Sequence, residues 1–480
     1  MNSDQGASFF WHDYESFGLN PRLDRPAQFA GQRTDLDLNP IGEPVSLYCR
    51  LSDDYLPDPD ACLITGIGPT TVQTRGLPEP EFVARIHAEL AKPQTCGLGY
   101  NTLRFDDEMT RHLLWRNLYE PYGREFRNGC SRWDILDLVR ATYAFRPEGI
   151  TWPRRDDGQV SFKLEHLTAA NGISHGRAHD ALSDVEATIA LARLIKTRQP
   201  RLFDFCLRLR QRQAVLDELA PLDGRPFLHV SGMYPASRGC MAVVAPLGWH
   251  PSNRNELAVW DLAHDPTELF DLDAEQLRRR LFARSDATNG ESRLPIKTIH
   301  LNRSPVVVGS LRALFPERAA ELGIDLERAL IHAERLKHGP KPEAALAAAY
   351  SRQEPIVPRD VDEALYDGFI GDRDRRSLDR LRRLAPAQLA DERVSFDDPR
   401  LEELLFRYRA RNWPDQLDAD ERLRWQAHRA DRLVDGAAGA LSLAALRERL
   451  AALREPADSA QTALLDELER YAAHLAATLA

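Results

Sequence analysis

The stretch SFFWHDYESFG, residues 8–18, decides how the rest of the chain is interpreted. Its aromatic residues up to Trp11 indicate a buried β-strand, yet Asp13 and Glu15 follow two residues apart. Side chains two apart on a strand point to the same face, so the two carboxylates would lie side by side. At roughly 5 Å and an effective dielectric constant of about 20, their repulsion is on the order of 3 kcal/mol. Either the strand ends near His12 and both acids are solvated, or a cation such as Mg²⁺ or Mn²⁺ neutralises them.

Length and composition exclude several classes of protein. A chain of 480 residues exceeds what one hydrophobic core supports, so two or three domains are expected. The N-terminus has no basic start followed by an apolar run, and no stretch of 18 apolar residues follows, so we expect a cytoplasmic protein without a membrane span. The net charge of −10 argues against a protein that coats nucleic acid with its whole surface, but it allows a local basic groove. The six cysteines are dispersed, which favours free thiols over disulfides or a zinc site.

Three zones of different pattern divide the chain. Residues 8–196 alternate strand-like and helix-like stretches, which indicates an α/β domain. Residues 225–309 contain short β-rich runs separated by Pro, Gly and Asn, typical of a small barrel, and the chain beyond 357 is helical. We therefore predict domains at 8–196, 200–354 and 357–480. In the first we expect strands at Ser8–Asp13, Glu43–Leu51 and Thr95–Tyr100, and helices at Glu79–Ala91, Asp106–Asn117, Ser131–Thr142, Leu164–Ala170 and Ala181–Ile195.

Two later stretches supply further acids. In GYNTLRFDDEM, Asp106 and Asp107 stand near the start of an amphipathic helix, where an aspartate alone is typical of a cap. In RAHDALSDVE, His179 precedes a helix and Asp184 follows about one and a half turns later. Taken singly, each stretch is more typical of a helix terminus than of a site.

The order of these motifs is more specific than any one of them. The series DxE, then N-x-x-x-F-D before a helix, then H-x-x-x-x-D resembles the DEDDh superfamily of ribonuclease-H-like 3′→5′ exonucleases. The matching residues are Asp13, Glu15, Asp106, His179 and Asp184, framed by Asn101 and Phe105.

Longer motifs are similar to one family within that superfamily, bacterial exonuclease I. They include LDRPAQFA, GYNTLRFDDE, RPEGITWP, WHPSNRN and LLFRYRARNWP, which are spread over nearly the whole chain. The resemblance implies a ribonuclease-H-like exonuclease domain, a Src-homology-3-like barrel and an all-α C-terminal domain that form a clamp over DNA. It also implies processive 3′→5′ degradation of single-stranded DNA to 5′-mononucleotides, in DNA repair and recombination.

Phosphodiester hydrolysis gives each matching residue a role. Two Mg²⁺ ions, which Mn²⁺ can replace, would activate a water and stabilise the phosphate transition state. We assign Asp13, Glu15, Asp106 and Asp184 as metal ligands and His179 as general base, because imidazole titrates near neutral pH. Alignment with the family favours Asp106 over Asp107 as the ligand, so that Asp107 is a helix-start residue.

Candidate DNA contacts are less specific. They are Glu15, Ser16, Phe17, Lys163, Arg111, Tyr122 and Arg146. Phe17 would either stack on the terminal base or lie in the core beneath the sheet. Lys163 stands where the family often has arginine, and a lysine there could not bind a phosphate in the bidentate geometry of arginine. Arg407, Arg409 and Arg411 either contact DNA or are spread over different faces of a helix.

The family resemblance also implies a partner, the acidic, hydrophobic-ended C-terminal tail of the bacterial single-stranded DNA-binding protein (SSB), with Arg146 in the matching region. We expect a monomer. Two alternatives remain: a DEDDh exonuclease acting on RNA or duplex ends, and a catalytically inactive nucleic-acid-binding scaffold. The 280 residues after the first domain argue against the former, and the complete set of ligands and histidine argues against the latter.

Overall fold

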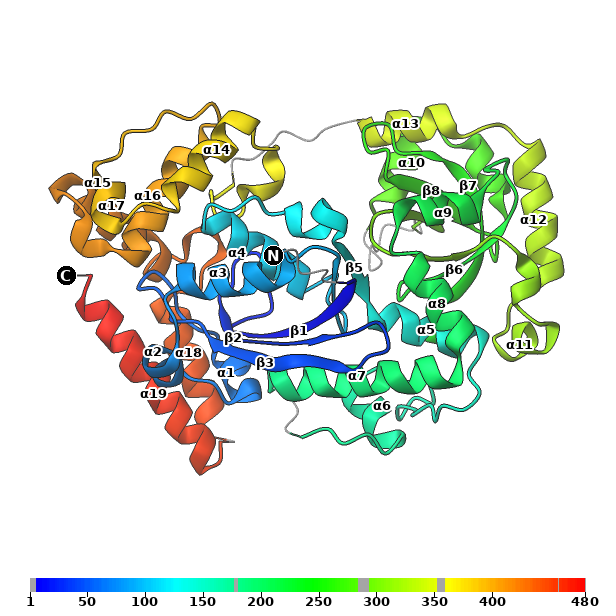
Figure 1. The fold of residues 1–480 in the computed structure, drawn as a ribbon. Coiled ribbons are helices and arrows are strands. Elements are labelled where there is room, and N and C mark those ends of the chain that lie inside the picture. Colours follow the sequence, from blue (N-terminus) through cyan, green and yellow to red (C-terminus); the bar gives the residue numbers. More distant parts are fainter. Residues whose placement is uncertain (1–5, 177–179, 284–292, 352–358, 456, 480) are drawn as a thin grey trace. The chain divides into compact units, whose positions relative to one another are not determined.

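The computed structural model describes residues 6–176, 180–283, 293–351, 359–455 and 457–479 (Figure 1). They divide into two compact units. The first unit comprises residues 1–131, 176–186 and 358–480, and the second comprises residues 132–175 and 187–357. Segments from both ends of the chain therefore share the first unit.

Strand β1 (Ser8–Ser16) lies inside the sheet of the first unit. It pairs antiparallel with β2 (Pro26–Thr34) and parallel with β4 (Thr95–Gly99), and β3 (Pro40–Tyr48) pairs with the outer side of β2. The parallel pairing stops at Trp11, so the last residues of β1 extend past the end of β4. Gly99 permits the close approach of the two strands here, because a Cβ at that position would lie 2.4 Å from the carbonyl oxygen of His12.

Two helices cover one face of β1 (Figure 1). They are α3 (Glu79–Leu90) and α4 (Asp106–Arg116), and their apolar side chains pack with Phe10 and Tyr14. Because side chains alternate along a strand, Asp13 and Glu15 point to the opposite face. The hydrophobic effect of this packing therefore fixes which face of β1 presents the acids.

The other elements of the first unit come from both ends of the chain. They are α1 (Pro59–Thr65), α2 (Pro69–Arg75), α14 (Asp372–Leu381), α15 (Pro386–Asp391), α16 (Arg400–Asn412), α17 (Ala419–Leu433), α18 (Leu443–Arg454) and α19 (Ser459–Ala477). Helices α18 and α19 pack with α1 and α2 around a core that includes Phe17, Leu446 and Leu468. The C-terminal helices thus complete a core that begins at the end of β1.

The second unit is built on an antiparallel sheet in the order β10-β6-β7-β8-β9. Its strands are β6 (Phe227–Val230), β7 (Met241–Trp249), β8 (Glu256–Asp261), β9 (Ile296–His300) and β10 (Val306–Val308). Its helices include α5 (Ile135–Phe145), α6 (Leu164–Ala170), α8 (Pro200–Arg208), α9 (Arg212–Leu219), α10 (Ala274–Leu281), α11 (Pro316–Glu321), α12 (Leu326–His338) and α13 (Glu343–Ser351). Helix α7 (Ala181–Arg198) and strand β5 (Ser131–Asp134) each run from one unit into the other.

The predicted fold class is confirmed, whereas some predicted elements are wrong. The predicted helix Ser131–Thr142 is wrong at its start, because Ser131–Asp134 is a strand and α5 begins at Ile135, where the Asp134 side chain accepts the N–H of Leu136. Strand β2 was not predicted, and β1 continues to Ser16 rather than ending at Asp13. The predicted domain boundaries stay predictions.

The prediction of free thiols is confirmed, since all six cysteines are buried and unbridged. Among the described helices, none is both long and apolar enough to cross a membrane.

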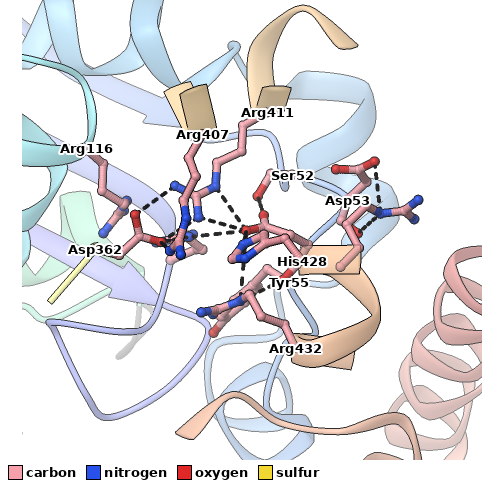
Figure 2. Close-up of polar contacts among 12 residues, drawn as sticks. Ser52, Asp53, Tyr55, Arg116, Asp362, Arg407, Arg411, His428 and Arg432 are labelled. Atoms are coloured by element: carbon pink, nitrogen blue, oxygen red, sulfur yellow. Dashed lines mark hydrogen bonds and ion pairs between the residues drawn. The ribbon is translucent and has the colours of Figure 1, made fainter. Parts of the chain in front are cut away.

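A buried ionic network joins the C-terminal helices to the N-terminal part of the first unit (Figure 2). Arg411 of α16 donates to Asp54 at 2.8 Å and to Asp362 at 3.0 Å, and both carboxylates are almost fully buried. Arg25, in the loop after β1, lies 3.5 Å from Asp362. Burial alone would raise the pKa of Asp54, but Arg411 and the neighbouring cations hold this pKa well below its usual range.

The other two arginines of the LLFRYRARNWP motif are also paired with acids. Arg407 contacts Glu403 at 2.7 Å and Asp360 at 2.6 Å, and Arg409 forms a bidentate pair with Glu421. Of the two interpretations left open by the sequence, these contacts favour structural arginines on a helix over DNA contacts.

We expect Arg411→Ala to lower the free energy of unfolding by about 3–5 kcal/mol, because it leaves two buried carboxylates without their main partner. Chemical denaturation followed by circular dichroism measures this change. Arg449→Ala is the matched control, since Arg449 also joins a C-terminal helix to an N-terminal aspartate, Asp60, but this pair is exposed and its loss should change little. Equal effects of the two substitutions would contradict the importance assigned to the buried network.

Candidate metal centre

Three carboxylates converge at the end of β1. Asp13 and Glu15 come from the strand and Asp184 from the first turn of α7, and one oxygen of each lies within 4.8 Å of the others. In the described part of the chain, this is the group of acids, histidines or cysteines whose geometry could hold a metal ion. The structure thus brings together three of the four predicted ligands.

The fourth predicted ligand, Asp106, lies beside them. It is the first residue of α4 and 3% exposed, and its Oδ1 accepts the backbone N–H of Tyr14 at 3.0 Å. Because Tyr14 stands between Asp13 and Glu15, this hydrogen bond attaches the start of α4 directly to the acidic end of β1. Asp106 also contributes to the electrostatic field at Asp13.

Burial and mutual repulsion change the acidity of the group. Burial, followed by the charges of Asp106, Glu15 and Asp184, raises the pKa of Asp13 well above its usual range. Burial, followed by Asp184 and Asp180, raises the pKa of Glu15 to about 8. Since both effects disfavour the ionised forms, a bound divalent cation would stabilise the group. Carboxylate oxygens are the ligands that Mg²⁺ and Mn²⁺ prefer, so these residues fit such ions.

Asp107 has a different environment from its neighbour Asp106. Its Oδ1 lies 2.5 Å from Nη2 of Arg124, and both side chains are 1% exposed. Asp107 is therefore more than the helix-start residue that the sequence suggested, because it forms a fully buried ion pair. Arg124 was not predicted in this role, because no local pattern connects it to Asp107.

The structure also places the residues around the acids. His179 lies outside the described residues, so its role as general base stays a prediction. The hydroxyl of Ser16 donates to the carbonyl of Gly18 at 2.7 Å. Phe17 is 0% exposed and belongs to the core formed with the C-terminal helices, which favours the core interpretation over stacking on a base.

Of the proposed DNA contacts in the first unit, Arg111 is already bound to acids. It is buried, forms a bidentate pair with Glu125 at 2.7 and 2.8 Å, and contacts Glu108 at 2.9 Å. Its guanidinium also stacks on the half-buried ring of Tyr122. Phe369 was not among the predicted contacts, although it is 87% exposed and makes an edge contact with Tyr122.

Lys163 and Arg146 belong to the second unit. Lys163 is exposed and lies 3.5 Å from Glu165. Arg146 donates to the carbonyl of Ala313 at 3.2 Å and stacks on the ring of Phe315 at 4.4 Å. Contacts of either residue with DNA or a partner stay predictions.

Comparison with known proteins places all three zones in one family. Family models match residues 10–192 (Exonuclease), 210–352 (Exonuclease I SH3-like domain) and 359–475 (Exonuclease I C-terminal domain). Exodeoxyribonuclease I of Escherichia coli K12 is 47% identical over 426 residues, which cover 88% of this chain and 90% of the relative.

Solved structures are similar over almost the whole chain. E. coli exonuclease I in complex with a dA16 oligonucleotide superposes with a TM-score of 0.93 at 45% identity, covering 98% of this chain and 100% of the other. A complex of SSB and exonuclease I with the inhibitor CFAM has a TM-score of 0.90 at 44% identity, with the same coverage.

The raised pKa of Glu15 predicts that the metal-free protein loses stability as the pH rises. Because the pKa of this carboxyl is about 8 in the folded state and about 4.5 in the unfolded state, its contribution to the free energy of unfolding is fully present below pH 4.5 and is lost as the pH rises through 8. We expect Glu15→Gln to have a higher Tm than the wild type at pH 9 in EDTA, with the difference shrinking towards pH 5. Glu43→Gln, on the exposed strand β3, is the control that should show no such trend. A difference between Glu15→Gln and wild type that does not vary with pH would contradict the assignment.

Proposed function

The chain belongs to the exodeoxyribonuclease I family, and on this premise we propose that it degrades single-stranded DNA processively from the 3′ end, releasing 5′-mononucleotides in DNA repair and recombination. The observation that carries the proposal is the convergence of Asp13, Glu15 and Asp184, with Asp106 attached beside them. The related E. coli enzyme in complex with a dA16 oligonucleotide supports the choice of substrate.

The four carboxylates would hold two Mg²⁺ ions, which Mn²⁺ can replace. Bound there, such ions supply Lewis-acid activation of a water and neutralise charge on the phosphate. Asp13, Glu15, Asp106 and Asp184 fix where this happens, because β1 and the first turns of α4 and α7 hold them. His179, five residues before Asp184, would accept the proton of the attacking water, a role that suits a side chain titrating near neutral pH.

Partly exposed aromatic residues suit a substrate without fixed sequence. The ring of Tyr122 lies 6.5 Å from that of Tyr366 and 5.9 Å from that of Phe369, centroid to centroid, in the first unit. Stacking of bases on such rings contributes about 1–3 kcal/mol per base and does not depend on the base. This group supports single-stranded DNA over duplex DNA, in which the faces of the bases are already stacked.

The proposal predicts which end of which nucleic acid is attacked. Purified protein with Mg²⁺ should release labelled mononucleotide at once from 3′-labelled single-stranded DNA, and only at the end of digestion from 5′-labelled DNA. Blunt duplex DNA and RNA should be poor substrates, and a chase with excess unlabelled DNA should leave few intermediates. The matched control is His179→Ala, which should lose several orders of magnitude of rate but still bind metal.

Each alternative function gives a different result in this experiment. Equal digestion of RNA or of blunt duplex would favour a DEDDh exonuclease of other specificity. Absence of digestion with any divalent ion would favour an inactive scaffold.

We further propose that the chain binds the C-terminal tail of SSB, which is acidic and ends in apolar residues. The complex of SSB with a related exonuclease I supports this partner. Arg146 offers a cation beside the half-exposed ring of Phe315, which suits a peptide with a carboxylate next to apolar side chains.

Arg146→Ala should weaken binding of a fluorescently labelled SSB tail peptide about tenfold or more, because a hydrogen bond to a charged group contributes about 1.5–3 kcal/mol. Fluorescence anisotropy at low salt measures the affinity, which should fall as salt is added. Arg155→Ala is the control, since Arg155 is an exposed arginine of the same unit that pairs with Asp157. Wild-type affinity in the Arg146 variant would exclude Arg146 from the peptide site.

A further inference from the structure

The first turn of α4 contains three consecutive buried acids, Asp106, Asp107 and Glu108. Adjacent residues of a helix point in directions about 100° apart, so the three carboxylates cannot share one partner. Each buried carboxylate therefore requires hydrogen bonds or a cation of its own. How the three are satisfied determines where the first of them, the metal ligand Asp106, is held.

The structure shows a separate partner for each acid. Asp106 accepts the N–H of Tyr14 at 3.0 Å, and Asp107 pairs with Arg124 at 2.5 Å. Glu108 accepts from Arg111 at 2.9 Å through one oxygen and from the hydroxyl of Tyr366 at 2.7 Å through the other.

Tyr366 connects α4 with a segment 258 residues away from Glu108 in the sequence. Its hydroxyl donates to Glu108 and accepts from Arg111 at 3.0 Å, so it lies between the two charged groups. One turn further along α4, the indole N–H of Trp115 donates to the carbonyl of Val361 at 2.8 Å. The segment before α14 is thus fixed to α4 at two successive turns, and Tyr366 is the attachment next to the metal ligand.

Arg111 alone does not hold Glu108 firmly. Its guanidinium is shared with Glu125, to which it makes two hydrogen bonds, so only Nη1 remains for Glu108. Without the Tyr366 hydroxyl, Oε2 of Glu108 would lose its hydrogen bond and keep only the longer ion pair with Arg22 at 3.9 Å, while the acids at positions 106 and 107 continued to repel it. The first turn of α4 would then lose one of the attachments that hold it, and Asp106 would be held less firmly.

We propose that Tyr366 is a positioning residue for the metal centre, whose hydroxyl fixes Glu108 and thereby holds Asp106 at the acidic end of β1. The inference rests on the proposed function, because it assumes that Asp106 is a metal ligand. It gives the C-terminal segment a direct part in assembling the catalytic site.

The test is Tyr366→Phe, which removes the hydroxyl and keeps the ring. Isothermal titration of Mn²⁺ into the full chain without DNA should show binding about tenfold weaker than in the wild type, the lower end of the effect of removing a residue that orients a metal ligand. The apparent Mn²⁺ requirement of digestion should rise by a similar factor.

Tyr471→Phe is the matched control. The hydroxyl of Tyr471 also joins a C-terminal helix to the exonuclease region, by bonds to the carbonyls of Ser52 and Tyr55 at 3.3 and 3.4 Å, but it does not contact α4. Both variants should lose a similar amount of thermal stability, and only Tyr366→Phe should bind Mn²⁺ more weakly.

The possible outcomes separate the inference from the proposed function. Wild-type Mn²⁺ affinity in Tyr366→Phe, or equal weakening in both variants, would overturn the positioning role. If the wild-type chain bound no Mn²⁺, or bound it as well after Asp184→Ala, the metal centre itself would be refuted instead.

Discussion

The repulsion among the buried carboxylates at the end of β1 is the constraint on which the rest of the structure depends. Asp13, Glu15 and Asp184 lie within reach of one ion and Asp106 lies beside them, although burial raises the pKa of Asp13 and Glu15. A fold that keeps them together without a metal must hold them by rigid elements and directed hydrogen bonds. The hydrogen bond from Tyr14 to Asp106 does this at the strand, and the partners of Asp107 and Glu108 do it along α4.

The buried ionic network also neutralises buried carboxylates, and it lies at the end of the loop that connects β1 with β2. Arg25 follows β1 and contacts Asp54 and Asp362 together with Arg411, so the loop that leaves the acidic strand is held by a helix 357 residues away from Asp54. Arginine suits this position because its planar guanidinium can bind two carboxylates at once and stays charged when buried. The C-terminal helices therefore stabilise the geometry of β1 as well as adding their own surface.

The sequence predicted those features that depend on local spacing. Two acids two residues apart on a strand must share a face, which is why Asp13 and Glu15 were identified. Strand β2 was missed because Pro26 at its start and Gly31 inside it are typical of a turn. Arg111 and the arginines at 407, 409 and 411 were considered as DNA contacts. Arg111 and Arg407 each have one acid within a helical turn, Glu108 and Glu403, but further partners are distant in sequence: Tyr366 is 255 residues from Arg111, and Asp362 is 49 from Arg411. Local spacing therefore shows only part of the pairing of these arginines.

The neighbours Asp106 and Asp107 mark the limit of what spacing alone can decide. Both are buried at the start of one helix, and motif alignment alone favoured the first as ligand. Their roles differ because a step of one residue along a helix turns the side chain by about 100°. That rotation aims Asp106 at the backbone of β1 and Asp107 at Arg124. Asp107 is paired with a buried guanidinium, whereas Asp106 faces the acidic end of β1 and adds to the negative charge at Asp13. The placement of the two side chains therefore favours Asp106 as the metal ligand, and it does so independently of any resemblance.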